Sequence, residues 1–230
     1  MAFPGFDSGD FPGIAALQAW FGNSPYQWVS YYLTAPCHTA GGFVPYTGNR
    51  AAIAGLGYGM AIIYVGRVQG GCGDGTLSRG QGFTDGQDAV ARTVAEGFAD
   101  GSTVFLDVEH YNPPIRQDMQ DYIGGWLNAV KTTSNLNPGI YVHHANFDEV
   151  NLAAETEYAA MGLPGGHPKY WVLFAGGPPF DLATSAPADC GIVLANAWQG
   201  IIGVIDQSFG GVAISPIDEN VADTPNPSGP

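Results

Sequence analysis

The chain has 230 residues, of which 45% are apolar, and 21 acidic residues outnumber 7 basic ones to give a formal net charge of −14. This apolar fraction supports a substantial core and argues against disorder. Nucleic-acid binders need a basic surface, which so few cations do not provide, and anionic membranes are disfavoured for the same reason. No segment approaches the roughly 20 apolar residues of a membrane span. We expect neither a nucleic-acid nor a membrane partner, whereas a sugar polymer is compatible with this charge.

Strand-like and helix-like segments alternate along the chain, and no linker divides it. After a first strand that ends at Phe6 and Asp7, we expect strands at residues 27–33, 60–65, 104–108, 139–143, 170–175, 193–198 and 212–217. Helices are expected at residues 13–21, 50–56, 85–98, 116–132 and 148–161, where apolar residues recur at helical spacing. Residues 176–192 are rich in glycine and proline and indicate no regular element.

This alternation predicts an α/β protein with a parallel sheet and right-handed crossovers. About eight repeats in one chain of this length favour a single (β/α)8 TIM-type barrel, regular or irregular, over residues 1–220. The competing fold is an open doubly wound sheet, but no Gly-x-Gly-x-x-Gly follows the first strand, which weakens a nucleotide-binding version. Residues 221–230 are rich in proline and are expected to form a flexible tail.

The segment at residues 103–110 is an apolar run that ends in two carboxylates, Asp107 and Glu109. Residues two apart in a strand point to the same face, so the Cβ atoms of these two acids would lie roughly 6–7 Å apart. Two carboxyl groups at such a separation can share acid and base work on a glycosidic bond. The plainer interpretation is that both are solvated residues at a strand end.

In a barrel, functional groups lie at the C-terminal ends of the strands. Applied to the expected strands, this rule adds Asp7, Tyr141, His143, Trp198, Gln199 and Asp218 to Asp107 and Glu109. Each has a plainer alternative: Asp7 caps a turn, His143 closes a loop, Trp198 belongs to the core, and Asp218 starts a turn. Together they predict a rim of acids, a histidine and aromatic groups.

Four segments also resemble a known family in their order and spacing. They are Gly5-Phe6-Asp7, Tyr31 to His38, Ile63-Tyr64-Val65-Gly66 and Leu106-Asp107-Val108-Glu109. They are similar to the glycoside-hydrolase-like domain of secreted actinobacterial and fungal proteins, which is related in fold to the lysozyme-like family 25 glycoside hydrolases. The resemblance runs from residue 5 to about residue 220 and implies a (β/α)8-type barrel with a groove at its top.

The resemblance also implies roles for single residues. Glu109 would be the general acid, while Asp107 or Asp7 would position the substrate, stabilise the oxocarbenium-like charge or act as the base; Asp218 completes the catalytic set. The candidate substrate-binding residues are Tyr141, His143, Trp198, Gln199 and Tyr64. The long Gly-rich loop at residues 70–82 and the unusual region at 176–192 depart from the family pattern.

These features predict a glycoside hydrolase that cleaves a cell-wall or other amino-sugar polysaccharide by carboxylate acid/base catalysis, without a metal or cofactor. The expected partner is a polysaccharide or oligosaccharide, and the sequence does not indicate an oligomeric state. One alternative is a catalytically silent barrel that binds glycans at the cell surface. Another is a phosphodiesterase-like barrel in which the carboxylates hold a divalent cation.

Cysteine use bears on the compartment. Cys37 and Cys72 each follow an expected strand and could form a disulfide that leaves Cys190 over, or all three could be reduced. The first residues, Met-Ala-Phe-Pro-Gly, lack the charged and apolar regions of a signal peptide. We expect a secreted or cell-surface protein whose leader is absent from this chain, with a cytoplasmic location left open.

Overall fold

The computed structural model describes residues 2–40, 42–108 and 110–230, and eight of its strands close into a barrel. Their order around the barrel is β1-β10-β7-β6-β5-β4-β3-β2. The bounds are β1 (Phe3–Asp7), β2 (Trp28–Tyr32), β3 (Gly59–Val65), β4 (Thr103–Val108), β5 (Asn137–His143), β6 (Lys169–Leu173), β7 (Ala195–Val204) and β10 (Ile217–Ala222). The predicted TIM-type barrel is confirmed.

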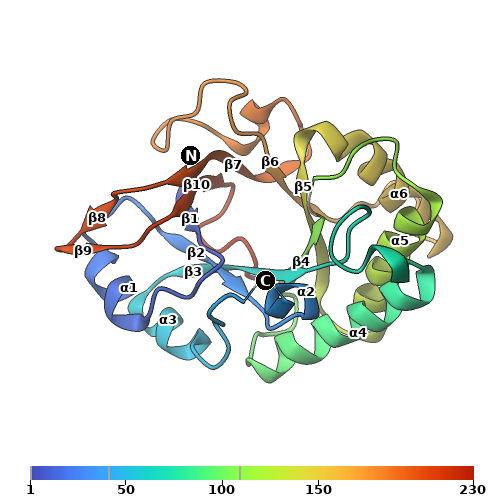
Figure 1. Cartoon of the computed structure of the whole chain (residues 1–230), viewed down its shortest axis with the longest axis horizontal. Coiled ribbons are helices and arrows are strands. Elements are labelled where there is room, and N and C mark those ends of the chain that lie inside the picture. The colour runs from blue at the N-terminus through green and yellow to red at the C-terminus, as the bar shows by residue number, and fades with distance from the viewer. Residues whose placement is uncertain (1, 41, 109) are drawn as a thin grey trace.

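Helices surround the ring of strands in Figure 1. They are α1 (Ile14–Trp20), α2 (Pro36–Ala40), α3 (Arg50–Leu56), α4 (Arg79–Ala95), α5 (Gln117–Thr133) and α6 (Phe147–Ala160), with short 3-10 turns η1 (Asp74–Thr76), η2 (His144–Asn146) and η3 (Pro187–Cys190). Five of the six helices were expected. Helix α4 starts earlier than predicted, because Ser78 caps it by accepting a hydrogen bond from the Gln81 amide at 3.1 Å.

The closure of the barrel differs from a regular (β/α)8 pattern. Strand β10 is antiparallel to both β1 and β7, whereas the other neighbours in the barrel are parallel. The strand predicted at residues 212–217 is wrong: β9 (Val212–Ala213) pairs instead with β8 (Ser208–Phe209) in a hairpin. The chain returns directly from β7 through this hairpin, and an antiparallel return needs no crossover helix.

The flexibility expected for residues 221–230 stays a prediction, and the structure places this segment against the barrel. Val221 and Ala222 belong to β10, and the following residues run across the N-terminal end of the barrel. Strand β3 pairs with β4 only from Ile62 onward, so its earlier backbone groups need other partners. The side chain of Asn226 accepts from the Met60 amide at 2.9 Å, and the Ser228 hydroxyl accepts from the Ile62 amide at 2.7 Å. These bonds hold the tail against the barrel.

The barrel interior is filled by a layer of large aromatic side chains. Trp28, Phe105 and Trp171 are buried there, and the Trp171 ring centroid lies 5.4 Å from that of Trp28 and 6.0 Å from that of Phe105. The indole of Trp171 donates a hydrogen bond to the Asn220 side chain at 2.9 Å. An eight-stranded barrel is just wide enough for side chains to fill it. This layer therefore forms a floor beneath the C-terminal end of the barrel.

Cys37 and Cys72 form a disulfide with a Cα–Cα distance of 6.0 Å, while Cys190 is free and buried. The bond joins α2 to the loop that follows β3. One of the two arrangements expected from the sequence is thereby established.

Gly5 has no room for a side chain, since a Cβ atom there would lie 2.1 Å from the Trp28 ring. We predict that Gly5→Ala lowers the free energy of unfolding by about 1–3 kcal/mol, because Trp28 must leave its place in the aromatic layer. Gly55→Ala is the matched control, because a Cβ atom in that part of α3 meets nothing within 4 Å. The control should be neutral or stabilising by about 0.5–1 kcal/mol. Urea denaturation measures both, and equal stabilities would contradict the packing argument.

The contact of the tail can be tested with Ser228→Ala, which leaves the Ile62 amide without its acceptor. We expect the free energy of unfolding to fall by about 1–3 kcal/mol, the usual effect of an unsatisfied buried donor. Ser208→Ala in the exposed hairpin should change it by less than about 0.5 kcal/mol. Thermal melts compare the two variants, and a Ser228→Ala protein as stable as the wild type would show that the tail is detached in solution.

Candidate functional site

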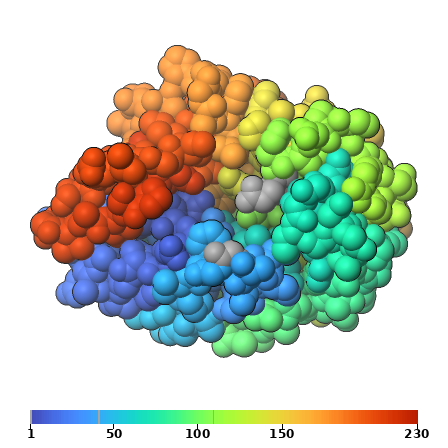
Figure 2. Space-filling view, viewed as in Figure 1, coloured from blue at the N-terminus to red at the C-terminus, as the bar shows by residue number. Residues whose placement is uncertain are grey.

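A cavity of about 560 Å³ opens above the aromatic layer, at the C-terminal end of the parallel strands. Its described lining is Asp7, Tyr32, Asp107, Tyr141, Leu173, Gln199, Ile202, Gly203 and Asp218. Figure 2 shows the surface hollowed near its centre, where segments from both ends of the chain meet. The carboxylates predicted at residues 7, 107 and 218 therefore share one cavity.

Strand geometry explains why these acids face inward. Side chains two apart in a strand share a face, so Asp107 lies on the same side of β4 as Phe105, one layer higher. Asp107 pairs with Val65 on β3 and with Tyr141 on β5, and its side chain is only 4% exposed. Glu109, the predicted general acid, lies outside the described residues.

Asp7 enters the cavity from β1 and is 4% exposed. The Tyr32 hydroxyl donates a hydrogen bond to Asp7 Oδ2 at 3.1 Å. Burial, together with the charges of Asp7 and Asp107, raises the pKa of Tyr32 well above its ordinary value, so this hydroxyl stays protonated and remains a donor. Tyr32 therefore fixes the orientation of the Asp7 carboxylate.

Asp218 lies opposite Asp7 in the antiparallel pair of β1 and β10. Its two oxygens accept hydrogen bonds of 2.6 Å, from the Gln199 side-chain amide and from the Gly203 backbone. The Tyr141 hydroxyl in turn donates to Gln199 Oε1. Burial raises the pKa of Asp218 despite these two donors, which act in the opposite direction. A chain of hydrogen bonds thus runs from Tyr141 to the carboxylate.

Two predicted substrate-binding residues do not reach the cavity. Tyr64 lies between Ile63 and Val65, on the outer face of β3, and its hydroxyl donates to Asp88 of α4 at 3.0 Å. Trp198 is fully buried on the outer face of β7 and packs edge-on against Phe180 at 4.9 Å. Both side chains belong to the core between barrel and surrounding segments, as the plainer interpretation of Trp198 proposed.

The predicted histidine lies at the rim rather than in the cavity lining. The His143 ring is 4.6 Å from that of His110, and its Nδ1 accepts from the Ala145 amide at 3.1 Å. Burial first, and then the neighbouring His110 and His144, lower the pKa of His143, so it is neutral at neutral pH. The His144 ring stacks on that of Phe174, with ring centroids 3.9 Å apart.

Four residues in the described lining escaped the sequence analysis, and one of them is Leu173 at the end of β6. Tyr32 ends β2 at an inward position, two residues after Ser30, and the strand-end rule could have found it. Ile202 and Gly203 come from the part of β7 that extends beyond the barrel, and Ile202 is 54% exposed. Their position depends on the antiparallel return to β10, for which the sequence offers no local signal.

Within residues 2–40, 42–108 and 110–230, no group of three or more His, Cys, Asp or Glu side chains is arranged to hold a metal ion. The helices of this same part of the chain include none that is long and apolar enough to cross a membrane.

The fold and the site together are those of a closed α/β barrel with several carboxylates in a cavity above an aromatic layer. The sequence model of the Rv2525c-like, glycoside hydrolase-like domain matches residues 18–220. The chain belongs to this family. No curated protein matches the chain.

Solved structures share the whole fold. The Tat-secreted protein Rv2525c of Mycobacterium tuberculosis, in complex with L-tartrate, has a TM-score of 0.61 at 15% identity, with 97% of this chain and 96% of that one covered. A family 25 glycosyl hydrolase from Bacillus anthracis has a TM-score of 0.57 at 13% identity, with 96% and 89% covered. The modular autolysin LytC from Streptococcus pneumoniae, in complex with a synthetic peptidoglycan ligand, has a TM-score of 0.51 at 12% identity, with 96% and 46% covered. At these identities the likeness establishes the fold.

The burial of Asp218 and its two hydrogen-bond donors allow the direction of its pKa shift to be predicted. Because the pKa of Asp218 is raised in the folded protein, folding favours its protonated carboxyl group. This protonation stabilises the fold fully below the ordinary Asp pKa of about 3.9. The stabilisation is lost as the pH rises through the raised pKa of the folded state. Gln199→Ala removes one donor to the carboxylate and should raise the pKa of Asp218 further. A ¹³C NMR titration of the carboxyl groups measures the pKa of Asp218 in the wild type and in Gln199→Ala.

Asp118 provides the internal control for this titration. Its hydrogen bond with Arg116 lowers its pKa, and it lies on α5 outside the cavity. The Gln199→Ala substitution should leave it unchanged. An Asp218 pKa at or below that of an unfolded aspartate would contradict the effect of burial.

Proposed function

We propose that this protein is a glycoside hydrolase that cleaves a cell-wall or other amino-sugar polysaccharide by carboxylate acid/base catalysis. The observation that carries the proposal is the gathering of Asp7, Asp107 and Asp218 in one cavity above the aromatic layer. Membership of a glycoside hydrolase-like family supports the same reaction class. The family 25 glycosyl hydrolase of the same fold supports it further.

The sequence assigns Glu109 as the general acid. It would give its proton to the leaving oxygen as the glycosidic bond breaks, and water would then add to the anomeric carbon. A second carboxylate would accept the proton from that water, or would orient a substrate N-acetyl group that attacks first. Asp107 and Asp7 are the candidates for this part, since both carboxylates enter the cavity.

Asp218 and Tyr141 fit a supporting part. The Tyr141 ring packs edge-on against Trp171 at 5.2 Å, and its hydroxyl donates to Gln199. Leu173 and Ile202 provide apolar surface in the lining. Tyr141, Gln199 and Asp218 together would hold one wall of the cavity rigid.

A second candidate function is a glycan-binding barrel without catalysis. It is favoured by the way Asp218 uses both oxygens for internal hydrogen bonds, as a structural acceptor does. The autolysin of the same fold that was solved with a peptidoglycan ligand supports glycan recognition in either case. The two candidates differ only in whether a bond is cut.

We also propose that the protein works outside the cytoplasm. The Cys37–Cys72 disulfide supports this location, because disulfides persist in oxidising compartments. The Tat-secreted protein of the same fold from Mycobacterium tuberculosis points the same way.

The reaction is tested by comparing the wild type with Glu109→Gln and Asp107→Asn on peptidoglycan and chitin. We expect the release of reducing ends to fall about 10²–10⁴-fold in Glu109→Gln, because an amide cannot supply the proton. Asp100→Asn is the control. Asp100 lies before β4, at the other end of the barrel, and its side chain accepts a hydrogen bond from Asn135. It should retain wild-type activity.

Glycan affinity, measured by calorimetry on the same variants, separates the two candidates. A folded wild type that releases no reducing ends, and whose affinity survives both substitutions, is a binding module. A folded wild type that neither cuts nor binds these glycans would remove both functions for these substrates.

A further inference from the structure

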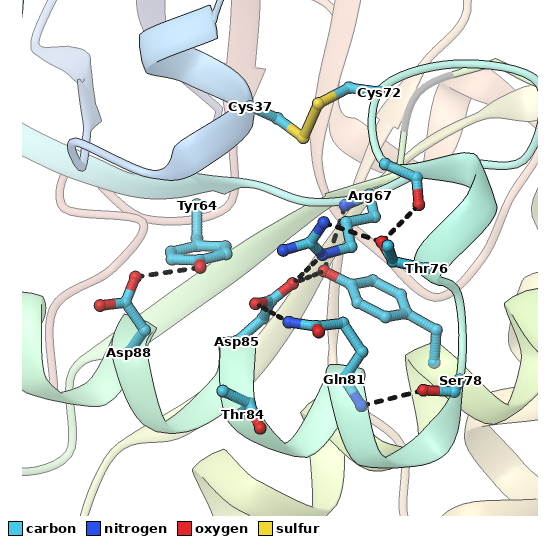
Figure 3. Close-up of polar contacts among 12 residues, drawn as sticks. Cys37, Tyr64, Arg67, Cys72, Thr76, Ser78, Gln81, Thr84, Asp85 and Asp88 are labelled. Carbon is cyan, nitrogen blue, oxygen red and sulfur yellow. Dashed lines mark hydrogen bonds and ion pairs between the residues drawn. A yellow bond between two sulfur atoms is a disulfide. The ribbon is translucent and has the colours of Figure 1, made fainter.

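The loop after β3, residues 66–78, is rich in glycine and yet firmly tied to its surroundings. The disulfide fixes Cys72 to α2, and Arg67 Nε contacts Asp85 Oδ2 of α4 at 2.7 Å. Arg67 also donates to the Thr76 hydroxyl at 2.9 Å, within the loop itself. Figure 3 shows these contacts on both sides of the loop. The loop therefore has a defined shape, contrary to the flexible loop its glycines suggest.

The same loop is bound to the next one along the barrel, residues 110–116 after β4. The Gln69 side chain donates to the backbone oxygens of Asn112 at 3.0 Å and of Pro114 at 3.2 Å, and it accepts from the Arg116 amide at 2.8 Å. An ion pair of 2.8 Å between Arg116 and Asp74 adds a second link. The two loops thus form one rigid unit.

A cavity of about 270 Å³ lies between these two loops, and we call it the loop pocket. Its lining includes Gly70, Gly71, His110, Asn112 and Arg116. Arg116 is already paired with Asp74 and Asp118, so its charge is largely compensated. The pocket is polar without a free charge of its own, which suits a neutral ligand rich in hydroxyl and amide groups.

The loop pocket is the immediate neighbour of the central cavity. Asp107 lines the central cavity and His110 lines the loop pocket, so at most about 10 Å of extended chain separates the two positions. In the strand order, β3 and β4 lie across the barrel from β7 and β10, whose extension provides Ile202 and Gly203. Figure 2 shows these segments, in teal and in red, on opposite sides of the hollow.

We propose that the loop pocket is a second sugar-binding subsite. It would bind a neutral pyranose of a polysaccharide whose neighbouring sugar units lie in the central cavity. The proposal rests on the proposed function. His110 Nδ1 is held by the Asn146 side chain at 2.9 Å, which leaves Nε2 for a sugar hydroxyl. Gly70 carries no side chain, and a Cβ atom there would meet nothing within 4 Å, so a ring can approach its backbone.

Rigidity is what makes the pocket effective as a subsite. Ordering a flexible loop on binding lowers the affinity, because it costs conformational entropy. Contacts that already hold the loop in the free protein avoid this cost. The disulfide and Arg67 supply such contacts from outside the pocket lining, and Gln69 supplies one from within it. This gives a reason for holding an exposed glycine-rich loop so firmly.

The test compares a chito-hexasaccharide with a chito-disaccharide as ligands for the wild type, Asn112→Ala and His110→Ala. We expect both variants to bind the hexasaccharide about five- to tenfold more weakly, as for the loss of one hydrogen bond, and the disaccharide with unchanged affinity. Asn135→Ala, an exposed asparagine before β5 at the other end of the barrel, is the control and should bind both as the wild type does.

Backbone amide resonances of Gly70 and Gly71 give a second readout, and they should shift with the hexasaccharide only. Equal losses for both ligands, or no loss for either, would overturn the subsite while leaving the proposed function standing. A wild type that binds neither oligosaccharide would overturn both together. Thermal melts of each variant confirm that a loss of affinity is not a loss of fold.

Discussion

The aromatic layer inside the barrel is the constraint on which the rest of the structure depends. Trp28, Phe105 and Trp171 fill the interior at one level, and the central cavity lies above them. The two-residue alternation of each strand then decides what lines that space, because a residue two beyond a buried aromatic must point into it. Gly5 belongs to the same arrangement, since its missing side chain makes room for Trp28.

The reversed last strand preserves this pattern rather than breaking it. Asp218 was predicted at the end of a strand, and it is the second residue of β10. Because β10 runs antiparallel to its neighbours, its beginning lies at the same end of the barrel as the ends of the others. Asp218 consequently lies opposite Asp7 in the β1–β10 pair. It occupies the predicted end of the barrel although its strand runs in the opposite direction to the one expected.

Much of the fold could be predicted because its signals are local. Apolar runs and helical spacing located all but the final strand, and the strand-end rule found the acids of the cavity. Strand alternation could also have excluded Tyr64 and Trp198: Trp198 and Gln199 are adjacent, so only one of them can face inward. Other features depend on contacts between distant segments, which no local pattern encodes. They are the position of Ile202 in the cavity lining, the hydrogen bond of Ser228 in the tail to the barrel, and the link from Gln69 to the next loop.

The cavity's electrostatics follow from the same packing. Its described lining contains three carboxylates and no basic side chain, and the histidine at the rim is kept neutral because its pKa is lowered. Burial above the aromatic layer raises the pKa of both Asp218 and Tyr32, since a charged form is poorly solvated there. Acids gathered without a compensating cation hold their protons more tightly. An environment of this kind suits a carboxyl group that must deliver a proton, and it is the filled barrel beneath that creates it.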